Sequence, residues 1–267
     1  MNTDEAIAPL RFVQLLADER RWRLLTELAR SDRKVNELVE LVGVPQNLVS
    51  YHLAGLRNAG LVSARRSSAD GRESYYRVDL GRCAELLSTV GPALQAALRI
   101  EPVEPLSLGV PQLRRRPTVL FLCTGNGARS PMAEALLEHH SRGAIRARSG
   151  GSHPKRLHPN AVRVMADRGI DISTRRSKHL DRFREMRFDR VITLCDKVRE
   201  ICPPFPGPTG LNVHWSMADP TAAGETDEAS YAAFVRTADE LETRIPFLIG
   251  ELIPHTERRT SNESQHR

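Results

Sequence analysis

The sequence has little cysteine, no long apolar run and no long internal repeat, and these absences narrow what the protein can be. Only four cysteines occur in 267 residues. The first residues, Met-Asn-Thr-Asp-Glu, lack the pattern of a secretory signal. No stretch approaches the ~18 consecutive apolar residues that a membrane span needs. We therefore expect a cytoplasmic protein without a membrane contact, whose thiols are catalytic or structural rather than permanently bridged.

The bulk composition is that of an ordinary globular protein with room for two domains. Hydrophobic residues make up 40% of the chain and charged residues 27%. The net charge of +6 permits nucleic-acid or oxyanion partners but proves neither.

The stretch 119–134 carries the strongest chemical signal. Val119 to Leu122 is an apolar run that predicts a buried parallel strand, and a glycine-bearing loop follows it. Ser130 and Pro131 are typical of a helix N-cap and a first helical position. Strand, loop and helix start together make a cradle for an anion, because backbone N–H groups and the helix dipole favour negative charge there. The predicted oxyanion-binding residues are Thr124, Gly125, Asn126, Gly127, Ala128, Arg129 and Ser130.

A cysteine and an arginine lie six positions apart in this cradle. The cradle is expected to favour the thiolate form of Cys123. The planar guanidinium of Arg129 can hold two oxygens of a tetrahedral oxyanion. The loop is thus predicted to place a sulfur nucleophile under a phosphate-like centre, although a buried cysteine on an ordinary strand-to-helix turn is the simpler alternative.

Cys-x5-Arg-Ser behind a hydrophobic strand, followed by Pro-Met-Ala-Glu, resembles the low-molecular-weight tyrosine phosphatase superfamily, which includes thioredoxin-coupled arsenate reductases. From residue 118 onward, strands and helices alternate, which predicts a doubly wound, four-stranded parallel sheet over 118–253. Strands are expected near 118–122, 145–149, 189–194 and 211–215, with helices near 131–141, 158–168, 196–201 and 227–250. Because sites in such sheets lie beyond the carboxyl ends of the strands, Cys123, Ser149, Cys195 and Asp219 are expected to converge.

Two further patterns separate the reductase branch from the phosphatase branch. Thr193-Leu194-Cys195 followed by Cys202-Pro203 resembles the two resolving cysteines of the reductases. The segment 214–220, His-Trp-Ser-Met-Ala-Asp-Pro, resembles their His-Trp-x-x-x-Asp-Pro segment. Phosphatases of this superfamily usually follow the Asp-Pro pair with tyrosines, whereas residues 221–224 here are Thr-Ala-Ala-Gly.

The resemblance implies a cysteine relay. Cys123 attacks arsenate held by Arg129, and Asp219 acts as the general acid. Cys195 then displaces arsenite, and Cys202 carries the disulfide outward, where thioredoxin as external reductant reduces it. No bound cofactor is expected.

The resemblance also names residues that shape the loop: Asn126, Glu134 and Ser149. Lys178 stands where relatives that bind potassium have a carboxylate, so we expect its ammonium to replace the ion and no metal to be required.

Residues 1–100 carry a different pattern. Apolar residues at helical spacing predict helices over 6–29, 34–43, 45–60 and 80–100. The second and third are joined by a tight Gly-Val-Pro turn, as in a helix-turn-helix. The segments 61–66 and 74–78 predict a β-hairpin, which is the expected wing. The N-terminal domain is therefore predicted to be a mainly α winged helix-turn-helix.

Val49-Ser-Tyr-His-Leu53 and Leu56-Arg-Asn-Ala-Gly-Leu-Val62 in this order resemble the arsenic-responsive (ArsR) repressors, which are winged-helix dimers. The resemblance implies a homodimer through the N-terminal domain, bound to double-stranded operator DNA. A small helical interaction module with a solvated basic face is the alternative. The expected DNA-binding residues are Gln46, Asn47, Ser50, Tyr51, His52, Arg57, Arg65, Arg66 and Arg72.

One departure concerns the inducer. Metalloid sensors of that family often carry a cysteine pair on the first helix of the motif, but residues 36–41 contain none. Cys83 is the lone thiol of the N-terminal domain, and a lone cysteine is more often a core residue than a ligand. The inducer and operator therefore stay open.

Residues 101–117 hold four prolines and one glycine, which predicts a linker. Residues 254–267 predict a disordered tail. The whole chain is predicted to be a fusion of an ArsR-like regulator with an arsenate reductase. Two alternatives remain: a regulator fused to a protein tyrosine phosphatase, or a regulator whose C-terminal domain is only an oxyanion or redox sensor. A mycothiol-type reductant also stays open.

Overall fold

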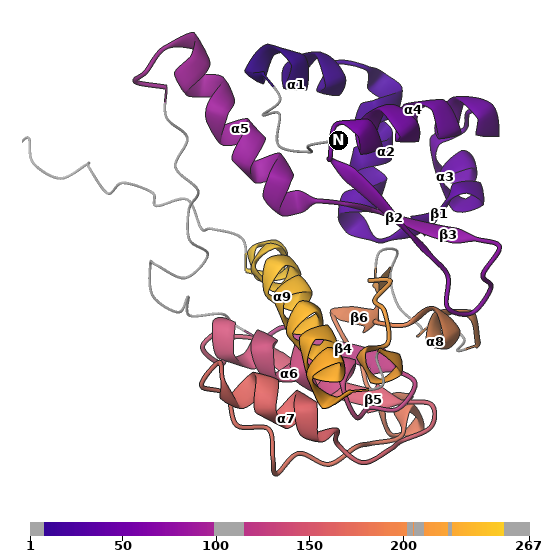
Figure 1. Cartoon of the computed structure of the whole chain (residues 1–267), viewed down its shortest axis with the longest axis vertical. Coiled ribbons are helices and arrows are strands. Elements are labelled where there is room, and N and C mark those ends of the chain that lie inside the picture. The colour runs from indigo at the N-terminus through magenta and orange to yellow at the C-terminus, as the bar shows by residue number, and fades with distance from the viewer. Residues whose placement is uncertain (1–7, 99–114, 202–204, 206–210, 224–225, 254–267) are drawn as a thin grey trace, which may run out of the picture.

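The computed structural model describes residues 8–98, 115–201, 205, 211–223 and 226–253. The expectations for Cys202, for most of the 101–117 linker and for the 254–267 tail lie outside these residues. The described chain forms two parts, one made by residues up to α5 and the other by β4 to α9 (Figure 1). Among the described residues, no helix is both long and apolar enough to cross a bilayer.

The N-terminal part is a winged helix. Its hairpin and a short first strand make an antiparallel sheet of order β1-β3-β2. Gly43, with φ at +72°, ends α3 in the left-handed conformation that glycine adopts without cost. Its elements are α1 (Pro9–Leu16), α2 (Glu19–Arg30), β1 (Arg33–Lys34), α3 (Val35–Val42), α4 (Gln46–Asn58), β2 (Val62–Arg66), β3 (Ser74–Val78) and α5 (Leu80–Leu94).

The expected single helix over 6–29 is wrong in one respect, because it is broken into α1 and α2. Helix α1 ends at Leu16, and Asp18 caps the start of α2 by accepting a hydrogen bond of 3.0 Å from the Arg21 N–H. An aspartate satisfies a free N–H group at a helix start better than it continues a helix. Strand β1 was not expected, since two residues carry no periodicity.

The C-terminal part is a four-stranded parallel sheet of order β5-β4-β6-β7. Helix α6 packs on β4 and β5, and α9 packs on α6 and α7. Its elements are β4 (Thr118–Cys123), α6 (Arg129–His140), β5 (Arg146–Gly151), α7 (Pro159–Ala166), β6 (Arg190–Thr193), α8 (Asp196–Ile201), β7 (Asn212–His214) and α9 (Asp227–Leu252), with short 3-10 turns η1 (Leu180–Phe183) and η2 (Pro220–Ala222).

This strand order creates a switch point beside β4. Strand β5, which follows β4 in the chain, pairs with β4 on one side, and β6 pairs with β4 on the other side. The carboxyl ends of β4 and β6 therefore border the crevice where doubly wound sheets bind ligands.

The start of α6 differs from the expectation. The helix begins at Arg129 with Ala128 as its N-cap, so Ser130 lies inside the first turn and is not the cap. Pro131 is tolerated there because the N–H it lacks has no partner in a first helical turn.

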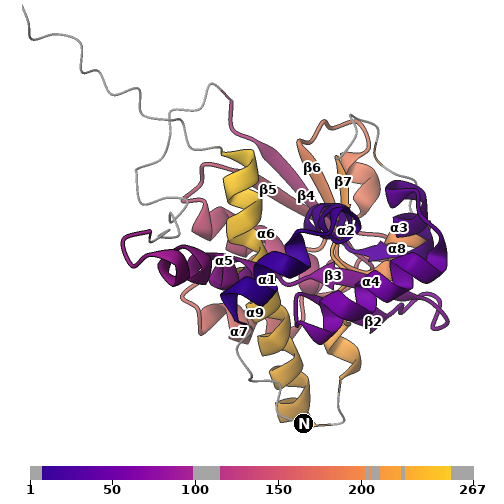
Figure 2. The same ribbon diagram turned by 90° about the horizontal axis from the view of Figure 1, so that it is seen from above.

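The two parts share an extensive contact, which we call the seam. Its residues come from the α2–β1 connection, the β2–β3 hairpin, α8, the segment after β7, and α9. The β2–β3 hairpin reaches down to α8, as Figure 1 shows. Figure 2, seen from above, shows α1 and α5 lying across α9. The Asp32 N–H donates to the His214 carbonyl at 2.8 Å, and Arg244 binds both carboxylate oxygens of Asp32 at 3.0 and 3.1 Å.

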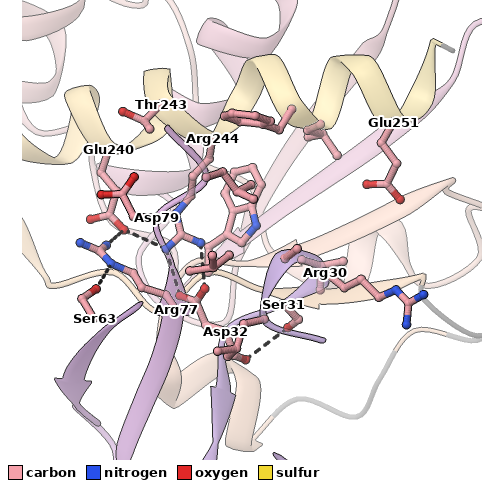
Figure 3. A pocket seen from close by; sticks show the side chains of 18 of the residues that line it. Arg30, Ser31, Asp32, Ser63, Arg77, Asp79, Glu240, Thr243, Arg244 and Glu251 are labelled. Atoms are coloured by element: carbon pink, nitrogen blue, oxygen red, sulfur yellow. Dashed lines mark hydrogen bonds and ion pairs between the residues drawn. The ribbon is translucent and has the colours of Figure 1, made fainter. Parts of the chain in front are cut away.

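A cavity of about 650 Å³ opens along this seam. Arg244 lies between Asp32 and Glu240 at its wall, and Arg77 reaches Ser63 and Glu240 (Figure 3). These four charged groups, Asp32, Arg77, Glu240 and Arg244, are thus paired across or along the seam.

Candidate active site

The loop between β4 and α6 begins at Cys123, a buried residue at the carboxyl end of β4. The carbonyls of Thr124, Gly125 and Gly127 each accept a 2.8 Å hydrogen bond from backbone N–H groups within 153–158. The carbonyl of Asn126 accepts one from the Ser177 hydroxyl, also at 2.8 Å.

These contacts orient the loop amides. In a trans peptide the N–H of the next residue points opposite to the carbonyl. Since the carbonyls of residues 124–127 are held on one side, the N–H groups of residues 125–128 point to the other. A ring of N–H groups facing one side is a nest in which an anion can bind.

Two glycines allow this close packing. A Cβ on Gly151 would lie 2.6 Å from the Thr124 carbonyl oxygen, and one on Gly127 would lie 2.6 Å from the Arg156 carbonyl oxygen. Both distances are too short for any side chain. Gly151 was missed by the sequence reasoning, because only the end of β5 lying against the loop reveals it.

Arg129 closes the nest with a side chain that is 5% exposed. Its Nη1 donates to the Met217 carbonyl at 3.1 Å, and its Nη2 donates to Asp219 Oδ2 at 2.9 Å. Its Nε is buried and has no hydrogen-bond partner among the described residues. A buried N–H without a partner is costly, so its retention points to a ligand oxygen as the missing acceptor.

A buried polar network holds the loop in shape. The Asn126 amide donates to Ser130 Oγ and to Ser149 Oγ, both at 2.9 Å, and Ser130 Oγ lies 3.0 Å from Cys123 Sγ. Asn126 has φ at +44°, a left-handed conformation that asparagine tolerates better than most residues. The network brings together the residues predicted to support the loop.

Glu134 and Lys178 complete that support. Lys178 Nζ lies 3.2 Å from Glu134 Oε2, which also accepts from the Ser149 hydroxyl, while Arg175 lies 3.2 Å from the other oxygen. The Lys178 backbone N–H donates to Asn126 Oδ1 at 2.7 Å. Within the described ranges, no group of three His, Cys, Asp or Glu residues could hold a metal ion.

Cys195 lies beside the loop, two residues after β6 ends. Its Sγ is 3.2 Å from Thr124 Oγ1, and the residue is 1% exposed. Burial raises the pKa of the Cys195 thiol, which Arg129 only partly offsets. The thiol is therefore held near Cys123 in its protonated form.

Asp219 faces the same opening from the segment after β7. Burial acts to raise its pKa, but the Arg129 guanidinium and hydrogen bonds from Thr221 outweigh burial and lower the pKa below its usual range. An oxyanion bound to Arg129 would take over that guanidinium and bring its own negative charge, which favours the protonated carboxyl that a general acid needs.

A second buried network, between Cys195 and Asp219, was missed by the sequence reasoning. Asp196 is fully buried and accepts from His214 Nε2 at 3.1 Å and from Ser216 Oγ at 2.7 Å. Burial opposes charge on Asp196, yet its hydrogen bonds and Arg65 hold its pKa well below the usual range. Burial lowers the pKa of His214, so a neutral ring donates to the carboxylate.

The predicted DNA-binding residues fall into two sets. On α4 and the hairpin the exposed ones are Gln46, Asn47, Ser50, Tyr51, Arg57, Arg66 and Arg72.

Two positions differ from the expectation of an exposed contact. His52 is 5% exposed with its Nδ1 3.8 Å from Asp18, and Arg65 points into the seam, where it binds Asp196 and Ser216. Both were placed on the exposed face because helix and strand periodicity do not show a neighbour from elsewhere in the chain.

Comparison with known proteins agrees with both parts. Residues 118–258 match the family model described as low molecular weight phosphotyrosine protein phosphatase, and residues 18–64 match that of bacterial regulatory proteins of the arsR family. A protein named arsenate reductase from Bacillus licheniformis is 41% identical over 128 residues, which is 48% of this chain and 91% of that relative. One from Halalkalibacterium halodurans is 39% identical over 127 residues, with the same coverage.

A solved structure described as an arsenate reductase in the phosphate binding state is 28% identical, with a TM-score of 0.41, and covers 51% of this chain and 98% of its own. The two family matches occupy the two parts of the structure in turn. The chain belongs to the low molecular weight phosphotyrosine protein phosphatase family and carries an ArsR-family helix-turn-helix domain ahead of its phosphatase-fold domain.

Proposed function

We propose that this protein reduces arsenate to arsenite and also binds operator DNA as an arsenic-responsive regulator. The observation that carries the enzymatic part is the buried Nε of Arg129, which has no hydrogen-bond partner in the part of the chain that the structure describes. It closes the loop that begins at Cys123 and whose carbonyls are held on one side. The curated relatives described above are named arsenate reductases, which supports arsenate as the oxyanion.

The first step is attack of the Cys123 thiolate on arsenic. Arg129 and the loop amides hold the arsenate oxygens and stabilise the charge that develops on them. Asp219 donates its proton to the departing hydroxyl, which leaves as water. The product is a covalent Cys123–arsenate adduct, in which arsenic is still pentavalent.

The second step reduces arsenic by two electrons. Cys195, as a thiolate, attacks Cys123 Sγ, and the electron pair of the sulfur–arsenic bond stays on arsenic, which leaves as arsenite. Cys123 and Cys195 are then joined by a disulfide. Cys195 must lose its proton for this attack, and the nearby Arg129 charge favours that loss.

The third step restores the site. Cys202 attacks Cys195, frees the Cys123 thiolate and passes the disulfide toward the surface, where the dithiol of thioredoxin reduces it. Thioredoxin is proposed because the sequence supplies a second resolving cysteine, which a relay ending in a single mycothiol-type mixed disulfide does not need.

The regulatory part rests on the ArsR-family match and on exposed polar residues along α4. Gln46 and Asn47 can pair with adenine edges in the major groove, while Arg57 contacts phosphate. We propose a homodimer, because α1 and α5, which lie side by side (Figure 1), both carry exposed large apolar side chains. These are Leu10, Val13, Leu87 and Leu94.

The test of the enzymatic part is turnover of arsenate with a thioredoxin system beside turnover of an aryl phosphate. Wild type should reduce arsenate over many cycles. Cys195→Ser should stop after the first covalent step but leave aryl phosphate hydrolysis largely intact. Cys83→Ser is the matched control, since Cys83 lies on α5, and it should behave as wild type.

Two other outcomes identify the alternatives. Hydrolysis of aryl phosphate without arsenate reduction would make the domain a phosphatase, which uses the same Cys123, Arg129 and Asp219. Tight arsenate binding with turnover of neither substrate would make it an oxyanion sensor.

A further inference from the structure

The hairpin of the DNA-binding domain reaches into the buried network next to the proposed catalytic residues. Arg65, near the end of β2, donates from Nη2 to Asp196 Oδ2 at 2.6 Å and from Nε to the Ser216 carbonyl at 3.2 Å. The Ser68 backbone N–H donates to the same Asp196 oxygen at 2.6 Å. Asp196 is thus satisfied partly from its own domain and partly from the wing.

Asp196 is placed where it can influence Cys195. It follows Cys195 directly and begins α8, so the position of its carboxylate fixes the turn that carries the thiol. The carboxylate is fully buried, and a buried charge left without its partner is strongly destabilising. Without Arg65, the Asp196 carboxylate would keep only neutral donors among the described residues, and any shift of that carboxylate would move the Cys195 turn with it.

Ser216 makes the second connection, toward Asp219. Arg65 holds the Ser216 carbonyl and also donates to its hydroxyl, while Asp32 accepts the Ser216 N–H at 2.7 Å. The next residue, Met217, gives its carbonyl to Arg129. The segment that ends at Asp219 is therefore fixed on one side by the N-terminal domain and on the other by the oxyanion-binding arginine.

We propose that Arg65 of the wing is a positioning residue of the catalytic site, which places the Cys195 turn and the Asp219 segment through Asp196 and Ser216. This role rests on the proposed function, because it presupposes turnover at Cys123. Through Arg65, the DNA-binding domain contributes to catalysis, and this role is separate from the DNA contacts of its helix-turn-helix.

The same hairpin supplies a matched control. Arg77, on β3, also forms an ion pair across the seam, but its partner is Glu240 on α9. Arg77 has no contact with Asp196, Ser216 or the segment up to Asp219 among its described interactions. Loss of Arg77 therefore reports on docking of the two parts, while loss of Arg65 reports on positioning as well.

The experiment compares Arg65→Gln and Arg77→Gln in the full chain, with arsenate and a thioredoxin system and separately with p-nitrophenyl phosphate. Arg65→Gln should lower kcat by about 10- to 100-fold, the scale of a small misplacement of reacting groups. The KM for arsenate should change by less than about threefold, because the oxyanion loop does not touch Arg65. Arg77→Gln should keep the wild-type kcat.

Arg65→Lys gives a further readout. One ammonium can hold Asp196 but cannot also reach the Ser216 carbonyl as the guanidinium fork does. Its kcat should therefore lie between those of wild type and Arg65→Gln. Should Arg65→Gln fail to fold, as judged by its thermal transition, Arg65→Lys against Arg77→Lys makes the same comparison with charge retained.

The outcomes separate the two proposals. If wild type reduces arsenate but Arg65→Gln retains full kcat, or Arg77→Gln loses as much, the positioning role is wrong and the proposed function stands. If wild type hydrolyses only p-nitrophenyl phosphate, arsenate reduction is wrong, and the same variants test the positioning role with that substrate. If wild type turns over neither substrate, both are wrong.

Discussion

The oxyanion loop and the wing were both identified from short sequence patterns, yet they differ in how far those patterns determine their contacts. In the loop, Cys123 and Arg129 border one nest because both lie within seven consecutive positions, while residues 153–158 and Ser177 hold the loop carbonyls. In the wing, Arg65 and Arg66 are neighbours in sequence, but Arg65 binds Asp196 while Arg66 bonds only to carbonyls of its own hairpin among the described residues. A compact loop is specified by its own sequence, whereas the partner of an exposed strand residue is decided by what docks against it.

Substitutions in these regions should therefore affect different properties of the protein. Changes in the loop should remove the chemistry outright, changes at the seam should alter its efficiency or the stability of the whole chain, and changes on the outer face of α4 should affect DNA alone. The following predictions test that order.

Cys123→Ser should have the largest effect, because a serine hydroxyl cannot replace the thiolate nucleophile. We expect both arsenate reduction and p-nitrophenyl phosphate hydrolysis to fall to background, while the thermal transition stays that of wild type. Retention of either activity within tenfold of wild type would remove the loop from the site.

Asp219→Asn should lower kcat by roughly 10²–10⁴-fold, the usual contribution of a positioned general acid. Binding of arsenate, followed by calorimetry, should be spared because Arg129 and the loop remain. Asp181→Asn, at an exposed carboxylate paired with Arg184, serves as the control and should leave kcat unchanged. Wild-type turnover in Asp219→Asn would make Asp219 a structural turn residue.

Asp32→Asn tests the seam itself. Asp32 is 2% exposed and forms a bidentate pair with Arg244, so its loss leaves the buried guanidinium with Glu240 as its remaining carboxylate partner among the described residues. The free energy of unfolding, measured with urea, should fall by about 3–5 kcal/mol.

Two comparisons sharpen that measurement. Replacing both partners, as Asp32→Asn with Arg244→Met, should recover most of the lost stability. Glu27→Gln breaks a more exposed helical pair with Arg30 and should cost less than about 1 kcal/mol. Equal costs for the buried and exposed pairs would show that the seam does not stabilise the chain.

Substitutions on α4 should leave turnover unchanged and weaken DNA binding. The free-energy change should be smaller than those expected for the loop and for Asp32. Asn47→Ala should cost ~1–3 kcal/mol and relax base preference at one position. Arg57→Gln should instead weaken all sequences alike and flatten the salt dependence. Fluorescence anisotropy with palindromic DNA from upstream of the gene measures both, and salt-insensitive binding would argue against the regulator.

Arsenite should have the smallest effect, namely no release of DNA through the N-terminal domain. Cys83 is its lone thiol, and burial raises the pKa of that thiol to about 11, so the thiolate that arsenite prefers is scarce at neutral pH. Titration of arsenite into the protein–DNA complex tests this. Release that occurs in wild type and disappears in Cys83→Ser would show that one thiol per subunit suffices.

The sequence by itself determined both folds and the chemistry of the loop. The alternation of strand and helix patterns located the strands of the parallel sheet to within about two residues. The clearest signal was the apolar run in β4, which is buried on both faces of the sheet. The spacing of Cys123 and Arg129 behind a strand determined the nest, since a turn of that length brings both ends to one point.

Tertiary structure alone decided what surrounds that nest. Asp196, His214 and Ser216 form one buried network, yet their wing partners, Arg65 and Ser68, lie more than a hundred positions away in the chain. No local pattern records such a contact, because strand and helix periodicity specify only which face of an element is buried, not which element covers it. The same reason explains why His52 and Arg65, both expected to face DNA, are turned toward the protein.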